Sequence, residues 1–241
     1  MRRPAHTLDP YDGLDPRDVA TYTVAEAAHY LWLPEQTLST WVYPRKYPTK
    51  SGKVKAGPVV PAADPKNRLL SFVNLLELHV LAAIRRQHGV RMADIRHAVG
   101  YLERRFGHEH PLVQADMATD GQDLFVSHLG ELVNITKEGQ LAMRELLTAH
   151  LRRIERDERG LAVRLYPFTR RGEASANAPR FVSIDPRVAF GRPVLAGTRI
   201  PTTEVAERFT AGEPMSALVR EYGRPAAEIE EAIRCEFRPA A

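Results

Sequence analysis

The chain has 241 residues, a length that suits one to two ordinary domains. Its 34 basic and 30 acidic residues give a net charge of +4, and 44% of its residues are hydrophobic, which excludes wholesale disorder. No apolar run is long enough for a membrane span, the start of the chain does not suit a signal peptide, and a single cysteine, Cys235, excludes a disulfide framework within one chain. We therefore expect a cytoplasmic protein.

Two short helices are predicted after an N-terminal tail of residues 1–21. Thr23 and Glu26 form a capping-box pattern that begins a helix running through Leu31, and Pro34 suits the start of a second helix. The inward positions of that second helix are apolar, namely Leu38, Trp41 and Val42. Its outward positions are polar, namely Gln36, Thr37, Ser39 and Thr40.

Most of the positive charge follows these helices. Residues 22–70 contain seven basic and three acidic residues, so this segment carries a charge equal to that of the whole chain. The basic residues nearest the second helix are Arg45, Lys46, Lys50, Lys53 and Lys55. A polar helix face followed by a basic loop is typical of a helix-turn-helix with a wing, in which both parts contact DNA. The alternative is an ordinary helical hairpin with solvated lysines.

Two longer apolar helices follow, one capped by Ser71 and the other closed by Gly107. Together with the runs Tyr22-Thr23-Val24-Ala25-Glu26 and Leu70-Ser71-Phe72, they make residues 22–110 resemble a MerR-type winged helix-turn-helix. MerR-type sensors commonly end in a dimerisation helix and a ligand or metal site. The local candidate for a metal site is His108-Glu109-His110, which is better explained as a solvated loop, so we expect no metal.

Residues 111–178 are predicted to form a connecting segment of a hairpin and a helix. Residues 124–126 and 132–135 have the composition of strands, joined near Gly130. Thr136 caps a helix whose apolar stripe suits either a dimer seam or packing on the same chain. The stripe consists of Met143, Leu147, Leu151 and Ile154. Small and polar residues at 172–179 suit a linker.

Residues 179–241 are predicted to form a small module of two short strands and three helices. Its characteristic runs are Ile184-Asp185-Pro186, Gly191-Arg192-Pro193-Val194, Gly197-Thr198-Arg199-Ile200 and Ala211-Gly212-Glu213. On these runs the module closely resembles family 433 of the domains of unknown function. Members of that family look like VapB-type antitoxins that are paired with a PIN-like ribonuclease toxin. The resemblance implies a type II antitoxin that binds a toxin and represses its own operon.

The charge of this module favours a protein partner. Its last helix is rich in glutamate, at Glu228, Glu230, Glu231 and Glu236, and would repel phosphates. Residues 180–199 carry four arginines against one aspartate, and an arginine on a glycine-framed turn can pair with the metal-binding carboxylates that the resemblance implies for the toxin. The alternative is that these arginines only brace the hairpin. The candidate toxin-binding residues are Arg187, Phe190, Arg192, Val194, Leu195 and Arg199.

The sequence thus predicts a mainly α (α+β) protein that has no cofactor and is not an enzyme, because it lacks a phosphate-binding loop, a nucleophile elbow and a paired His/Asp constellation. We expect an antitoxin that neutralises a PIN-like VapC-type ribonuclease and represses its own operon. Because one recognition helix reads few base pairs, we also expect a homodimer or larger assembly on a palindromic operator. The alternative is a MerR-like ligand-sensing regulator without a toxin.

Overall fold

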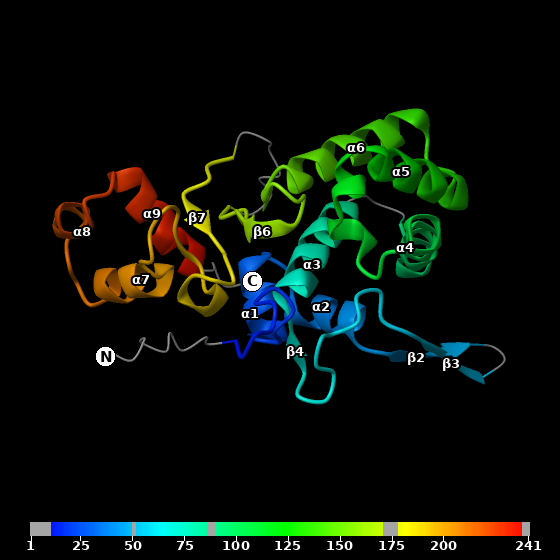
Figure 1. Ribbon diagram of the computed structural model, residues 1–241, viewed down its shortest axis with the longest axis horizontal. Helices are drawn as coiled ribbons and strands as arrows, with labels where there is room; N and C mark the ends of the chain where they lie inside the picture. The colour runs from blue at the N-terminus through cyan, green and yellow to red at the C-terminus, as the bar shows by residue number, and fades with distance from the viewer. Residues whose placement is uncertain (1–10, 50–51, 86–89, 171–177, 238–241) are drawn as a thin grey trace, which may run out of the picture.

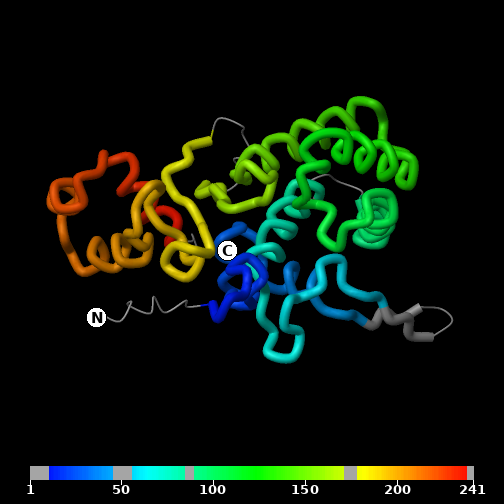
Figure 2. Tube along the Cα trace, viewed as in Figure 1, coloured from blue at the N-terminus to red at the C-terminus, as the bar shows by residue number. Residues whose placement is uncertain are grey.

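The computed structural model describes residues 11–49, 52–85, 90–170 and 178–237; residues 46–49, 52–55 and 85 are described by their backbone alone. The described chain is mainly helical, as the sequence predicts, and it has four small antiparallel strand pairs. Figure 1 shows two bodies: a larger one containing α1 to α6 and a smaller one containing α7 to α9. The blue N-terminal segment in Figure 2 lies between them.

The two N-terminal helices form as predicted. Thr23 caps α1 (Val24–Tyr30), where its hydroxyl accepts from the Glu26 N–H at 3.1 Å and the Glu26 carboxylate accepts from the Thr23 N–H at 2.8 Å. Pro34 immediately precedes α2 (Glu35–Val42). A short strand before α1, β1 (Tyr22–Thr23), pairs with β4 (Leu69–Leu70), which returns the chain to the start of the helix pair.

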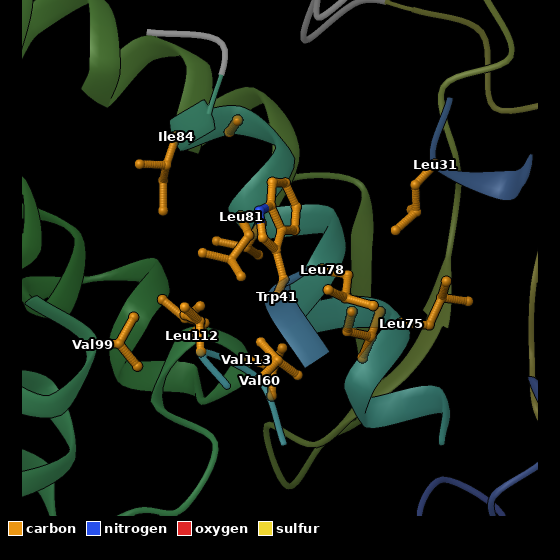
Figure 3. Packing of buried hydrophobic residues seen from close by; sticks show 14 of the residues in the cluster. Leu31, Trp41, Val60, Leu75, Leu78, Leu81, Ile84, Val99, Leu112 and Val113 are labelled. Carbon is orange, nitrogen blue, oxygen red and sulfur yellow. The ribbon is translucent and has the colours of Figure 1, made fainter. Parts of the chain in front are cut away.

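The larger body is built around α3 (Phe72–Arg85), whose leucines are buried. Trp41 of α2 is 1% exposed, and Figure 3 shows its indole beside Leu78 and Leu81 of α3. Next in the chain come α4 (Met92–Phe106) and the short 3-10 helices η1 (Pro111–Val113) and η2 (Ala115–Ala118). Burial of α2 against α3 fixes one side of α2 and leaves its other side outside the core.

The predicted strands at 124–126 and 132–135 are wrong, because residues 120–133 form one helix, α5 (Asp120–Val133), which Asn134 ends in a left-handed conformation. The buried side chains of Phe125 and Leu129 are spaced four residues apart, which is helical spacing. Gly130 is not a hairpin turn. A Cβ there would lie 2.6 Å from Nε2 of Gln140, so this glycine allows the next helix to approach closely.

That next helix, α6 (Lys137–Leu151), is capped by Thr136 as predicted. Its apolar stripe belongs to the same core as α3, which favours packing on the same chain over a dimer seam. The hairpin of this segment follows α6, as β5 (Ile154–Arg156) and β6 (Ala162–Leu165).

The C-terminal module has the predicted two strands and three helices. Strand β7 (Val182–Ser183) pairs with β8 (Val194–Leu195), and a 3-10 turn, η3 (Ala189–Gly191), lies between them. The helices are α7 (Thr202–Thr210), α8 (Met215–Tyr222) and α9 (Ala226–Glu236). They enclose a second core of Leu195, Val205, Leu218, Ile229, Ala232 and Ile233.

Arg153 holds the chain on both sides of the predicted linker. Its side chain is 0% exposed, stacks on the ring of Phe168 at 4.9 Å and donates to four backbone carbonyls at 2.6 to 3.0 Å. These carbonyls belong to Tyr166, Pro167, Ala178 and Pro179. Residues 172–177 of the linker lie outside the described residues, but its end at 178–179 is anchored on the larger body.

Candidate functional site

The outward face of α2 carries the four polar residues that the sequence assigns to DNA. Gln36 is exposed, whereas Thr37, Ser39 and Thr40 are half-buried. The hydroxyl of Thr40 donates to the Thr37 carbonyl at 2.7 Å, so it is satisfied within the helix. Gln36 is therefore the most accessible of the four for contact with a base edge.

A first wing, residues 45–56, follows α2 as predicted. Strands β2 (Arg45–Thr49) and β3 (Gly52–Ala56) pair in register from Arg45 opposite Ala56 to Thr49 opposite Gly52. The segment directly after the wing is held against α2, because the N–H groups of Val59 and Val60 both donate to the Trp41 carbonyl.

In Figure 1 the first wing extends away from the body of the molecule. Arg45 at its base is exposed. The backbone places Lys46 opposite Lys55 and Lys53 opposite Pro48. Lys50 lies outside the described residues.

A second wing, residues 64–69, also lies beside α2, and sequence reasoning did not assign it. Asp64 and Leu69 exchange backbone hydrogen bonds at 2.9 and 3.0 Å, and the Asp64 carboxylate accepts from the Asn67 N–H at 2.9 Å. The guanidinium of Arg68 lies 4.3 Å above the ring of Tyr43, the residue that ends α2. The available sequence signal was the Asp64-Pro65-Lys66-Asn67 turn with a second basic residue, Arg68, directly after it.

The second wing presents a basic group in a fixed position. Lys66 and Arg68 are both exposed, and Arg68 adopts a φ of 61°. Stacking on Tyr43 restrains the guanidinium without using its hydrogen-bond donors. A restrained guanidinium of this kind suits contact with a phosphate.

The candidate toxin-binding residues divide into exposed and buried ones. Arg187, Phe190 and Arg192 share one loop, residues 187–192, and all three are exposed. Val194 and Leu195 are 1% and 0% exposed. Both side chains are therefore buried in this structure and are not exposed for contact with a partner.

Arg199 lies on a separate turn that borders the same loop. It lines a cavity of about 300 Å³ together with Val188, and Gly197 allows the turn with a φ of 76°. The same cavity contains Arg164, whose guanidinium pairs with Asp185 at 3.1 Å. Arg199 is exposed, so the turn adds a further cation beside the 187–192 loop.

The 187–192 loop contacts the N-terminal half of the chain. The Tyr22 hydroxyl donates to the Gly191 carbonyl at 3.0 Å, and the Tyr11 hydroxyl donates to the Pro186 carbonyl. Burial raises the pKa of Tyr22 well above its usual range, which keeps its hydroxyl protonated as a donor. His29 of α1 lies 3.7 Å from the carboxylate of Glu236 in α9.

The acidic helix α9 is not the free anionic face that its sequence suggests. Glu231 is 1% exposed and accepts from Thr169, Arg170 and Arg234. Glu236 accepts from the hydroxyl of Thr202. Much of the negative charge of α9 is therefore neutralised by internal contacts and repels phosphates less than the sequence predicts.

A larger cavity, of about 850 Å³, lies at the base of the second wing. Its wall includes Asn74, whose amide accepts from the Ala63 N–H at 2.9 Å and donates to the Pro61 carbonyl at 3.0 Å. His110 at the cavity pairs with the buried carboxylate of Glu77 at 3.0 Å. This hydrogen bond raises the pKa of His110 above its ordinary value, while burial raises that of Glu77.

Within the described ranges, no group of three or more His, Cys, Asp or Glu residues could hold a metal ion. His110 of the predicted loop cluster is engaged by Glu77, and His108 lies 3.6 Å from Asp116. Cys235 is buried, and burial raises the pKa of its thiol. In the same described residues, we find no helix with the length and apolarity of a membrane span.

Two family models match the chain, one over each half. Residues 20–99 match the family described as "Putative DNA-binding HTH domain". Residues 182–234 match the family described as "Protein of unknown function (DUF433)". The first match contains α1, α2 and both wings, and the second contains the 187–192 loop.

Over nearly its whole length the chain is similar to proteins of Mycobacterium tuberculosis. It is 30% identical over 236 residues to a protein of strain ATCC 25618 / H37Rv named "Putative antitoxin VapB45", with 90% of this chain and 93% of that protein covered. It is also similar to the crystal structure of Rv2018 from M. tuberculosis, with a TM-score of 0.63 and 26% identity. That similarity covers 90% of this chain and 98% of the other.

Proposed function

The chain belongs to the family of the mycobacterial protein named "Putative antitoxin VapB45", and we propose that it is an antitoxin of a type II toxin–antitoxin pair in the cytoplasm. In this proposal it neutralises a PIN-like VapC-type ribonuclease by direct binding and represses its own operon by binding DNA. The observation that carries the proposal is the pairing of two surfaces in one chain. A polar helix has two basic wings near its C-terminal end, and a separate module presents exposed arginines.

The DNA-binding surface comprises α2 and both wings. Gln36, Thr37, Ser39 and Thr40 face the bases or phosphates, and the wing cations hold the backbone. Replacing Lys50, Lys53 and Lys55 with glutamate should weaken binding to all DNA and flatten its dependence on salt. Gel shifts with the operator region across salt concentrations test this expectation.

A control variant should carry the same change in charge elsewhere. Arg105, Arg159 and Arg220 are exposed and lie outside the two wings. Replacing these three with glutamate should leave most of the affinity in place. Equal losses in the two variants would indicate a general charge effect and would contradict the assignment of the first wing.

The toxin-binding surface comprises the 187–192 loop and the neighbouring turn of Arg199. An arginine there can form a bidentate pair with a carboxylate cluster of the toxin and displace its metal. Arg192→Glu and Arg199→Glu should abolish rescue from toxin expression while operator binding is retained, with Arg220→Glu as the control. Rescue and co-purification by both variants would overturn this arginine mechanism.

We further propose that the protein acts as a homodimer or larger assembly on a palindromic site. One α2 helix reads too few base pairs for specificity. Two α2 helices placed one turn of the DNA apart double the number of base pairs that are read. Light scattering with and without operator DNA tests this. A monomer in both conditions would contradict it.

A second candidate function is that of a ligand-sensing regulator, and the cavity at the base of the second wing favours it. The cavity of about 850 Å³ falls within the size of small-molecule sites, and Asn74 links its wall to the wing. The neighbouring genes discriminate between the two functions. A PIN-like nuclease gene supports the antitoxin, and an efflux or stress gene supports the sensor.

A further inference from the structure

The 187–192 loop contains a backbone feature that packing does not explain. Ala189, Phe190 and Gly191 have consecutive φ values of 47°, 54° and 77°. Glycine adopts this left-handed region freely, but a side chain with a Cβ is strained there, and such residues normally occur singly. A phenylalanine is among the residues least suited to the central position.

Burial does not account for this phenylalanine either. Phe190 is 68% exposed, the highest value among the large hydrophobic side chains that are exposed in the described chain. Its side chain therefore gains little from the core, while its backbone is strained. Strained residues of this kind cluster at binding sites, where the surrounding structure holds them.

The surrounding structure does hold this loop. The N–H of Gly191 donates to the Val188 carbonyl at 2.9 Å, and that of Arg192 donates to the Ala189 carbonyl at 3.1 Å. The Gly191 carbonyl in turn accepts from the hydroxyl of Tyr22, a residue that is 3% exposed. Phe190 is thus displayed on a rigid support, so little entropy is lost when a partner binds it.

We propose that Phe190 anchors the contact with the toxin and that Tyr22 positions it from the DNA-binding half of the chain. This inference rests on the proposed antitoxin function. Exposed Arg187 and Arg192 flank the phenylalanine, and residues 180–199 as a whole carry a net charge of +3. The matching surface on the toxin is an apolar pocket for the ring, bordered by carboxylates.

The test compares two exposed phenylalanines of the same module. The probe is the product of the neighbouring PIN-like nuclease gene, titrated into the full-length protein. Phe190→Ala should weaken binding at least about 30-fold, as expected for a central anchor, while Phe209→Ala, from a residue 40% exposed on α7, should change it less than about 3-fold. Operator binding should be the same in both variants.

Two further variants distinguish an effect on how Phe190 is presented to the toxin from an effect on folding. Phe190→Gly relieves the left-handed strain, so its melting temperature should equal or exceed that of the wild type while toxin binding is lost. Tyr22→Phe should weaken toxin binding about 3- to 10-fold and have no further effect in the Phe190→Ala background, which a purely structural role would not produce.

The outcomes that overturn the inference differ from those that overturn the proposed function. A wild-type protein that does not bind the nuclease would overturn the antitoxin proposal and this inference with it. A wild-type protein that binds, together with a Phe190→Ala variant within about 3-fold of it, would overturn only the anchor.

Discussion

The hydroxyl of Tyr22 donates a 3.0 Å hydrogen bond to the backbone carbonyl of Gly191, a residue 169 positions further along the chain. Tyr22 begins the strand that precedes the helix pair, and Gly191 ends the exposed turn of the C-terminal module. The N-terminal part of the chain, which carries the surface that we assign to DNA, therefore holds the toxin-binding loop through a buried hydrogen bond.

Gly191→Ala should destabilise the protein more than its backbone angle alone requires. A Cβ at this position would lie 2.0 Å from the Tyr22 hydroxyl oxygen, and the φ of 77° is unfavourable for alanine. We expect a loss of about 1 kcal/mol from the backbone and a further ~1–3 kcal/mol from the clash. Urea denaturation measures the sum.

Gly197→Ala is a matched control for this variant. Gly197 has a φ of 76°, and a Cβ there would have no atom within 4 Å. It should therefore lose only the backbone part, about 1 kcal/mol. Equal unfolding free energies for the two alanine variants would show that the approach of Tyr22 to Gly191 is not tight.

The elements that the sequence predicts well depend on local pattern. The reciprocal cap of Thr23 and Glu26 lies within one turn, so the residues alone indicate where α1 begins. The sequence also separated the basic first wing from the C-terminal module. The prediction of a hairpin turn at Gly130 is wrong, because a glycine required for close helix packing looks the same in a sequence as one required for a turn.

The parts that the sequence did not predict depend on contacts between distant residues. Val194 and Leu195 have no helical or alternating pattern that indicates burial, and they are enclosed by elements that fold over them. The stacking of Arg68 on Tyr43 joins residues from two loops. In the sequence Arg153 is one of several arginines near the end of a helix. Its burial becomes clear only in the folded chain, where backbone carbonyls from two distant segments surround its guanidinium.

Arg153→Lys should be strongly destabilising. The guanidinium donates to four backbone carbonyls at 2.6 to 3.0 Å, two of them in buried hydrogen bonds, and a lysine amine has neither the planar fork nor enough donors to reach them all. Leaving buried carbonyls unsatisfied should cost about 3 kcal/mol or more. Thermal unfolding measures this loss. Arg152→Lys, in the exposed neighbouring residue, should stay within about 0.5 kcal/mol of the wild type.

Arg68→Ala should weaken DNA binding without a preference for sequence. A phosphate contact adds affinity for all DNA, so its loss should reduce the slope of log affinity against log salt by about 1. Arg68→Lys keeps the charge but loses the planar stacking on Tyr43, so it should restore only part of the affinity. Fluorescence anisotropy over a salt series measures both. Arg220→Ala, in α8, is the control; an unchanged slope in Arg68→Ala would remove the second wing from the DNA interface.

The pair of Glu77 and His110 should make stability depend on pH. Both pKa values are raised in the folded protein, so the folded chain binds more protons than the unfolded chain and stability falls as pH rises. The His110 contribution is complete below its ordinary pKa of 6.5 and is lost as pH rises through the raised value. His110→Gln should therefore melt at a lower temperature than the wild type at pH 5, and this difference should shrink towards pH 8.

His108→Gln, two positions away and 45% exposed, is the control and should follow the wild-type curve. Parallel melting curves for wild type and His110→Gln from pH 5 to 8 would show that the pair does not hold this proton.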